Sequence, residues 1–380
     1  MSEIFYISPW DYAVYFDYTI FFLIAWAVIL CFKGTILDNK VVAINQILGM
    51  MVALILIFFI GMRPINVAFG DTMNYAVEFR KIAKSPDQFS WIRSKEWLWD
   101  IMMLFFAKYG NIHQLFLLCA SVYAGALWLA MRRIFKEYNY IPYLIILCMF
   151  TFWTYGVNGV RNGMGASLFI LAMTYTSNIP MMIGIALLGA GVHNSVYLML
   201  AGATLSWFVN HSKLYIVIWG ASILISLVFG NQIQELLSSF AYDMAGENKL
   251  TGYLSYTEAQ MLSDGLIVSR SFRWDFIAYS ALGVGVGYYF IFNREFKDLY
   301  YHWIYNTFLL CNTFWILIIR APYSNRFAQI SWFIMPVVLI YPFFKDRFWI
   351  NHEKMIGFGI MTFYSFTFFT MMLPHLLSLF

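Results

Sequence analysis

The stretch VAINQILGMMVALILIFFIGM, residues 42–62, decides the fold class of this chain. It carries no charged side chain, and at about 20 residues it is long enough for an α-helix to cross a hydrocarbon core about 30 Å thick. Similar apolar runs recur along all 380 residues, which are 61% hydrophobic and only 12% charged. The runs are continuous rather than alternating, as helical spans are. The sequence therefore predicts an all-α, polytopic helical membrane protein.

We predict about 12 transmembrane helices. The segment EWLWDIMMLFFAKYG, residues 96–110, is too short and too charged to be a span, and we expect an interfacial or protein-packed helix there. The runs between residues 162 and 210 are short, so broken or tilted helices are an alternative to three separate spans. The predicted spans are residues 13–32, 42–62, 112–131, 141–157, 162–178, 180–192, 195–210, 214–231, 274–292, 302–320, 327–344 and 356–377.

Basic residues in short loops predict the orientation of the chain, because such residues favour the inner side of the membrane. With the N-terminus outside, the inner short loops collect most of the lysines. The two long loops then fall outside: residues 63–111, which we expect to contain amphipathic helices, and residues 232–273. We treat residues 1–380 as a single integral membrane domain.

Arg161 lies in GVNGVRNGMGASLF, residues 156–169, at the predicted start of a helix. The glycines here have an ordinary explanation, a face of small residues that lets helices approach closely. That explanation does not account for the charge. A helix start also offers free N–H groups and the positive end of the helix dipole, which favour an anion. We therefore favour a phosphate-binding turn at Arg161 over packing alone.

Further arginines lie at the predicted outer ends of other spans. The planar guanidinium of arginine matches phosphate oxygens in a bidentate way, although single arginines can also reach towards lipid headgroups. Asp275 is close enough to Arg273 to be its ion partner. The candidate anion-binding residues are Arg270, Arg273, Arg320 and Arg326, with Asn325 in the turn before the last of them.

His193 lies in GAGVHNSVYLML, residues 189–200, between two apolar runs. Histidine is the side chain best suited to exchange a proton near neutral pH, and it binds phosphate when charged. A histidine at a helix end is also often only a satisfied polar residue. His193 is therefore a candidate catalytic residue with an ordinary structural alternative.

The first outer loop supplies carboxylates beside aromatic rings. Asp71 and Tyr75 lie at helical spacing, and Glu96 precedes Trp97 and Trp99. Sugars present apolar C–H faces and hydroxyl groups that need acceptors, so such a set suits a glycan. Tryptophan is also common at a membrane interface without any sugar contact.

The sequence also lacks the motifs of several common nucleotide-binding, hydrolase and metal sites. It has no Walker A motif, no GxSxG, no HExxH and no Asp-x-Asp pair. The four cysteines lie inside apolar runs without metal-binding spacing, and we expect them to be small buried residues. We predict no metal, no cofactor and no nucleic-acid partner.

The order of these segments resembles the EpsG-type group of the bacterial Wzy polysaccharide polymerases, over roughly residues 60–340. An Asp-Tyr pair follows the second span, at Asp71 and Tyr75, and Glu96 precedes an amphipathic helix. GVRNGMGASLFILA follows, then a small-x-His-x-Ser step at residues 191–195, and late in the chain Arg326 starts a span. Asn162 departs from this pattern, because related sequences often carry glutamine after the arginine.

The resemblance implies a GT-C-like membrane architecture and an inverting polymerase in the bacterial inner membrane, active on its periplasmic or extracellular face. Its substrates would be a donor and an acceptor glycan linked to undecaprenyl diphosphate, joined into O-antigen, capsule or exopolysaccharide. Other implied partners are membrane lipid, a Wzz-like chain-length regulator and a flippase. Among our candidates, Arg161 and the further arginines would hold the diphosphate, and His193 would be the general base, with Asp71 and Glu96 as alternatives. Tyr75, Trp97, Trp99 and Asn325 would contact the glycan.

Three other classes of protein share some of these features. A flippase or transporter of lipid-linked sugars needs cationic contacts too, but is expected to place them in a central cavity and often shows inverted repeats, which we do not find. An O-antigen-ligase-like transferase would differ only in its acceptor. A membrane acyltransferase is supported by the histidine alone.

Overall fold

The computed structural model describes residues 7–89, 94–245, 272–321 and 324–377. Within these residues every regular element is a helix and none is a strand, which confirms the all-α prediction. The chain divides into two compact units. Unit 1 comprises Met1–Tyr197 and Ile340–Phe380, and unit 2 comprises Leu198–Leu339.

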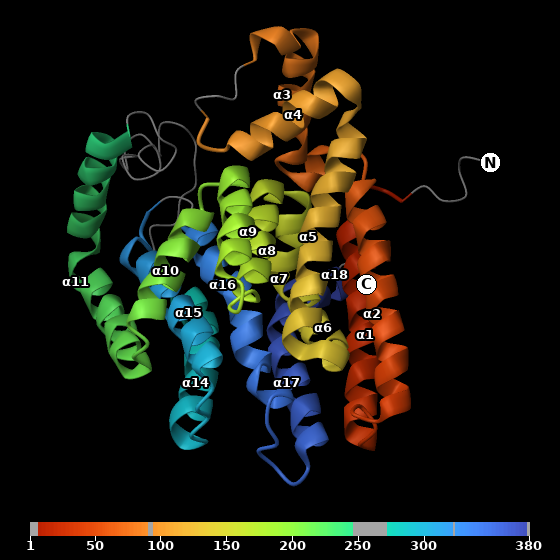
Figure 1. The fold of residues 1–380 in the computed structure, drawn as a ribbon, viewed down its shortest axis with the longest axis vertical. Helices are drawn as coiled ribbons and strands as arrows, with labels where there is room; N and C mark the ends of the chain where they lie inside the picture. Colours follow the sequence, from red (N-terminus) through yellow and green to blue (C-terminus); the bar gives the residue numbers. More distant parts are fainter. Residues whose placement is uncertain (1–6, 90–93, 246–271, 322–323, 378–380) are drawn as a thin grey trace. The chain divides into compact units, whose positions relative to one another are not determined.

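Unit 1 contains the N-terminal helices and the C-terminal ones (Figure 1). Its elements are α1 (Tyr12–Lys33), α2 (Asn39–Gly61), η1 (Val67–Phe69), α3 (Thr72–Lys84), η2 (Pro86–Gln88), α4 (Trp97–Tyr109), α5 (Ile112–Phe135), η3 (Lys136–Tyr138), α6 (Tyr140–Leu147), α7 (Phe150–Val157), α8 (Val160–Met173), α9 (Ile179–Val192), η5 (Pro342–Phe344), α17 (His352–Thr367), η6 (Phe368–Met372) and α18 (Leu373–Leu377).

Unit 2 contains the helices between them. Two helices cross the boundary, since α10 begins in unit 1 and α16 ends there. The elements are α10 (Val196–Phe208), α11 (Ser212–Ala245), α14 (Trp274–Tyr288), η4 (Tyr289–Asn293), α15 (Leu299–Leu317) and α16 (Asn325–Ile340).

Six helices in the described part of the chain are long and apolar enough to cross a membrane. A seventh span is formed if α6 and α7, which meet at a bend of 73°, count as one broken span. The runs between residues 162 and 210 form the short helices α8, α9 and α10, in line with the expectation of short helices there. The total of about 12 spans and the GT-C-like architecture stay predictions. The six spans are Tyr12–Lys33, Asn39–Gly61, Ile112–Tyr138, Ser212–Ile233, Trp274–Asn293 and Asn325–Phe344.

Helix α5 forms the core of unit 1 and packs against α2 and α8. Its start is fixed by a capping box, in which the Asn111 side chain accepts from the Gln114 N–H and the Gln114 side chain accepts from the Asn111 N–H. One face of α5 is fully buried, as the apolar residues Leu115, Phe116 and Leu127 show. Helix α5 thereby supports α8, which carries Arg161.

Helices α3 and α4 lie together at the end of unit 1 where α1 begins and α2 ends (Figure 1). Among the described residues of the segment 63–111, α3 and α4 are α-helices, and the predicted helix at residues 96–110 is α4. Of the second predicted loop, residues 232–245 continue α11, and residues 246–271 lie outside the described residues.

Arg63 connects three helices at this end of unit 1. Its Nη1 donates to the Ile60 carbonyl of α2 at 2.6 Å, and its Nη2 donates to the Val157 carbonyl of α7 at 3.2 Å. Nη2 also donates to Thr72 Oγ1 at the start of α3, at 2.8 Å. Helix C-termini leave carbonyls unpaired and carry partial negative charge, so a cation suits this position. Burial lowers the Arg63 pKa to about 10, and the side chain stays charged at neutral pH.

Candidate active site

Glu96 is held in place by its neighbours at the start of α4. Its backbone N–H donates to Ser94 Oγ at 3.1 Å. The indole of the next residue, Trp97, lies directly on Gly191 of α9, where a β-carbon would come within 2.6 Å of the ring. This close approach requires glycine at position 191. It also fixes the start of α4 against the end of α9, which brings Glu96 beside the turn that contains His193.

Arg161 is in the first turn of α8, as predicted, because the helix begins at Val160. Its Nη1 donates to Glu96 Oε2 at 2.5 Å, and each side chain is only 17% exposed. The guanidinium carbon lies 5.4 Å from the centre of the Tyr75 ring and 5.5 Å from that of Trp99. Both distances are within the range of a cation–π contact. One carboxylate and two aromatic rings therefore hold this guanidinium.

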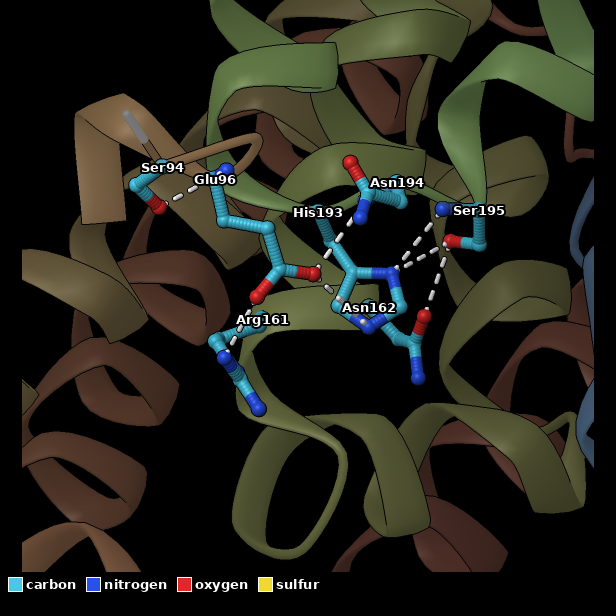
Figure 2. A network of polar contacts seen from close by, with 7 residues as sticks. All are labelled: Ser94, Glu96, Arg161, Asn162, His193, Asn194 and Ser195. Atoms are coloured by element: carbon cyan, nitrogen blue, oxygen red, sulfur yellow. Dashed lines mark hydrogen bonds and ion pairs between the residues drawn. The ribbon is translucent and has the colours of Figure 1, made fainter. Parts of the chain in front are cut away.

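His193 lies in the turn between α9 and α10 and faces the same carboxylate (Figure 2). Its Nε2 is 3.5 Å from Glu96 Oε1, and the backbone N–H of Asn194 donates to that oxygen at 3.3 Å. Its Nδ1 lies 3.1 Å from the Ser195 backbone nitrogen and 2.9 Å from Ser195 Oγ. Glu96 thus lies between Arg161 and His193, and its two oxygens accept from different partners.

Sequence reasoning did not select Asn162, Asn194 or Ser195 as site residues. Ser195 Oγ donates to Asn162 Oδ1 at 2.8 Å, so Asn162 connects α8 to the turn that contains His193 (Figure 2). Their position in the sequence could have indicated a role in the site, since Asn162 follows Arg161 directly and the other two follow His193. We refer to Glu96, Arg161, Asn162, His193, Asn194 and Ser195 as the Glu96 cluster.

The other residues predicted in the first outer loop have different surroundings. Asp71 is partly exposed at the start of α3, where its Oδ1 accepts from Asn74 Nδ2 at 3.0 Å and its backbone N–H donates to Asn158 Oδ1 at 2.8 Å. Tyr75 and Trp99 are 5% and 0% exposed, and their ring centres are 5.1 Å apart. Burial raises the Tyr75 pKa, so the phenol stays neutral. The predicted contact of these rings with glycan stays a prediction.

The other predicted anion-binding residues that the structure describes belong to unit 2. Arg273 forms a bidentate pair with Asp275, at 2.9 Å and 2.7 Å, which confirms the predicted ion partner. Arg320 Nη2 donates to the Leu227 carbonyl at 3.4 Å, and its side chain packs on Gly230. Asn325 and Arg326 are exposed at the start of α16. Arg270 lies outside the described residues. Their role in binding a diphosphate stays a prediction.

The cysteines are all free and buried, as predicted. They are Cys31, Cys119, Cys148 and Cys311. Within residues 7–89, 94–245, 272–321 and 324–377, no three His, Cys, Asp or Glu side chains form a group that could hold a metal ion.

A comparison with protein families matches residues 46–377 to the EpsG family. No curated protein and no solved structure matches the chain. The family match covers most of the chain and confirms the resemblance that the motifs indicated. It suggests a polysaccharide polymerase type of function, in the general class of glycosyltransferase-like enzymes, and it supports a multi-pass membrane protein. The chain belongs to the EpsG family.

Proposed function

We propose that this protein joins oligosaccharide repeat units carried on undecaprenyl diphosphate into a surface polysaccharide, on the outer face of the bacterial inner membrane. The Glu96 cluster supports the proposal most strongly. In a chain of the EpsG family, it places a cation and an imidazole on either side of one carboxylate at one end of unit 1. A cation can stabilise a leaving diphosphate, and a carboxylate or an imidazole can take the proton of an acceptor hydroxyl.

The proposed reaction is an inverting, metal-independent substitution. An acceptor hydroxyl oxygen forms a bond to the anomeric carbon of the donor glycan. The anomeric carbon–oxygen bond to the diphosphate breaks, and the electron pair leaves with the lipid diphosphate. The hydroxyl proton passes to a general base, for which Glu96 and His193 are the candidates in the cluster and Asp71 is an alternative.

Arg161 is the proposed contact for the leaving diphosphate. Positive charge that is already in place where negative charge develops is often the largest single contribution to catalysis. Its Nε is buried and has no hydrogen-bond partner among the described residues. An unpaired buried donor costs about 1–3 kcal/mol, and a bound anion that shifts this side chain could remove that cost. The free N–H groups of the first turn of α8 would add to the binding.

The proposal also covers the other predicted site residues, the architecture and the partner proteins. Arg270, Arg273, Arg320 and Arg326 would contribute to diphosphate binding, and Trp97 and Asn325 to glycan binding. The architecture would be GT-C-like with about 12 spans. A Wzz-like chain-length regulator and a flippase would act with the protein in the membrane.

A reconstitution assay tests the function. Purified protein in lipid is given a defined lipid-linked repeat unit, and the products are separated by size. The proposal expects a ladder of lengthened glycans on the lipid. Transfer of intact substrate across the membrane without a new bond would identify a flippase instead. A single transfer to a lipid A core acceptor would identify a ligase.

The substitution Arg161→Lys tests the contact with the diphosphate. Lysine carries its charge on one ammonium group and lacks the planar guanidinium of arginine. It therefore cannot make the hydrogen bonds by which Arg161 would contact Glu96 and a phosphate together. We expect elongation to fall about 100- to 1,000-fold, the usual cost of removing one strong donor of this kind. The measurement is ladder formation at equal amounts of purified protein.

Arg80→Lys is the matched control, since Arg80 is an exposed arginine of α3 whose Nε donates to the Ala76 carbonyl of its own helix. It should keep wild-type elongation. Full-length polymer from Arg161→Lys would remove Arg161 from the mechanism.

A further inference from the structure

The turn that contains His193 determines which ring nitrogen carries the proton. The backbone N–H of Ser195 points at His193 Nδ1 at 3.1 Å. A backbone N–H can only donate, so Nδ1 must accept and cannot carry a proton in this arrangement. A neutral imidazole has one N–H, which is therefore on Nε2. The tautomer follows from a contact inside a three-residue turn.

The contact of Ser195 Oγ is compatible with this assignment. Oγ lies 2.9 Å from Nδ1, and it donates its proton to Asn162 Oδ1 at 2.8 Å. With the hydroxyl proton on this bond, Nδ1 accepts from the Ser195 backbone N–H. Asn162 and Ser195 together hold the edge of the ring that faces away from Glu96 (Figure 2).

The opposite edge of the ring presents Nε2–H to Glu96. The distance from Nε2 to Oε1 is 3.5 Å, and catalytic hydrogen bonds of this kind often shorten when substrate binds. Asn194 N–H donates to the same oxygen at 3.3 Å, and Arg161 donates to the other oxygen at 2.5 Å. A carboxylate only accepts, and each of its oxygens has two lone pairs. Oε2 therefore keeps a lone pair that a sugar hydroxyl can use.

We propose that Ser195 and Asn162 are positioning residues that hold His193 as an Nε2–H donor to Glu96, and that Glu96 is the base. This inference rests on the function proposed above. The acceptor hydroxyl gives its proton to the Glu96 carboxylate as its oxygen bonds to the anomeric carbon, and the lipid diphosphate leaves with the electron pair. His193 does not receive that proton, because its lone pair is occupied inside the turn.

The first test reads the tautomer directly and needs no substrate. The full chain is labelled with nitrogen-15 in its six histidines and studied by NMR in lipid nanodiscs, and the His193 signals are assigned from their loss in His193→Gln. The expected spectrum has an unprotonated Nδ1 and a protonated Nε2 when the ring is neutral. A proton on Nδ1 would overturn the inference, whatever the protein catalyses.

The second test compares two amides at position 193. The side-chain NH2 of His193→Gln reaches towards the place of Nε2, and that of His193→Asn towards the place of Nδ1. If Nε2–H matters only as a donor, the glutamine variant should elongate glycan within about tenfold of the wild type, the value of one neutral hydrogen bond. Glu96→Gln should lose about 100- to 10,000-fold, the usual contribution of a general base. The asparagine variant should elongate more slowly than the glutamine variant.

Three results of this comparison would contradict the inference. If both His193 variants lose glycan elongation completely and equally, the imidazole itself is the base. If both His193 variants elongate glycan as fast as the wild type, His193 has no role in the reaction. Full activity of Glu96→Gln would remove Glu96 as the base. If the wild type forms no ladder, the proposed function fails, while the NMR result still decides the tautomer.

Two substitutions at position 195 test the role of Ser195. Ser195→Ala keeps the backbone N–H and should keep the tautomer, but it loses the hydroxyl that links the ring to Asn162. We expect kcat to fall with little change in KM, and Ser195→Thr to restore kcat because it supplies the hydroxyl again. A change in KM alone, or no recovery with threonine, would exclude a positioning role for Ser195.

Discussion

At the scale of single residues, Arg161 shows how this fold holds a charge near the membrane. Its guanidinium has the Glu96 carboxylate on one side and the Tyr75 and Trp99 rings close by. The proposed diphosphate would therefore have to share the guanidinium with Glu96 or displace it. The aromatic rings keep the side chain in position in either case.

Tyr75 gives a prediction for the dependence of stability on pH. Burial raises the pKa of this phenol above its usual 10.0. The folded protein therefore keeps the proton at a pH where the unfolded chain loses it. This contribution to stability is complete below about pH 10 and is lost as the pH rises towards the folded-state value. We expect the Tm of the wild type to fall more steeply above pH 10 than that of Tyr75→Phe, measured in detergent.

The comparison between these two proteins removes the effect of every other titrating group. Tyr109→Phe is the control, because Tyr109 is 77% exposed on α4. Its curve should run parallel to the wild type. A Tyr75→Phe curve that also runs parallel would show that the buried phenol makes no such contribution.

At the scale of elements, Arg63 fastens the ends of α2 and α7 to the start of α3. Arg63→Met leaves Thr72 and two helix-end carbonyls without this donor in a buried place. Leaving a buried polar group without its hydrogen-bond partner costs about 1–3 kcal/mol. We expect a lower Tm and weaker glycan elongation, because α3 carries Tyr75 beside Arg161.

Arg80→Met, on the exposed face of α3, should change Tm little and serves as the control. Arg63→Met with a wild-type Tm would show that the three helix ends hold together without the guanidinium.

The contact between α8 and α9 is a second determinant of the site. At Gly165 of α8, a β-carbon would meet Val196 Cγ2 at 2.7 Å and the Gly189 carbonyl at 3.2 Å. Gly165→Ala should therefore push the two helices apart and cost about 1–3 kcal/mol, as overpacking usually does. Because α8 carries Arg161 and α9 ends beside His193, glycan elongation should fall as well.

Gly184 of α9 is the matched control, because nothing lies within 4 Å of a β-carbon built there. Gly184→Ala should keep the wild-type Tm and activity, or raise Tm slightly through its better helix propensity. Equal Tm values for the two alanine variants would argue against close helix packing at Gly165.

At the scale of the whole molecule, the side of the membrane can be tested across one span. Arg80 on α3 and Lys40 at the start of α2 are both exposed and are separated by α2. In intact cells, a membrane-impermeant thiol reagent should label Arg80→Cys and leave Lys40→Cys unlabelled until the cells are opened. The native cysteines are buried and should react little. The reverse pattern would place the Glu96 cluster on the inner face and exclude the proposed substrate.

The sequence predicted the long apolar helices well, because the length and composition of a run are local properties. It also placed Arg161 at a helix start correctly, since glycine and asparagine before an apolar run are a local signal. It could not pair Arg161 with Glu96, 65 positions away, or Asn194 with Glu96, 98 positions away, because such contacts depend on how helices pack. Trp99 shows the same limit, because the sequence alone does not distinguish an aromatic ring that binds a sugar from one that packs in the protein core.

The shortness of α8 and α9 has a consequence for the lipid around the protein. Each helix has 14 residues, which gives a length of about 21 Å at 1.5 Å per residue, against a hydrocarbon core about 30 Å thick. Upright helices of this length leave a shortfall that a bilayer meets by thinning or by admitting water at the helix ends. We therefore expect glycan elongation to depend on acyl chain length, because shorter lipids would bring the headgroup region closer to the level of Arg161 and His193.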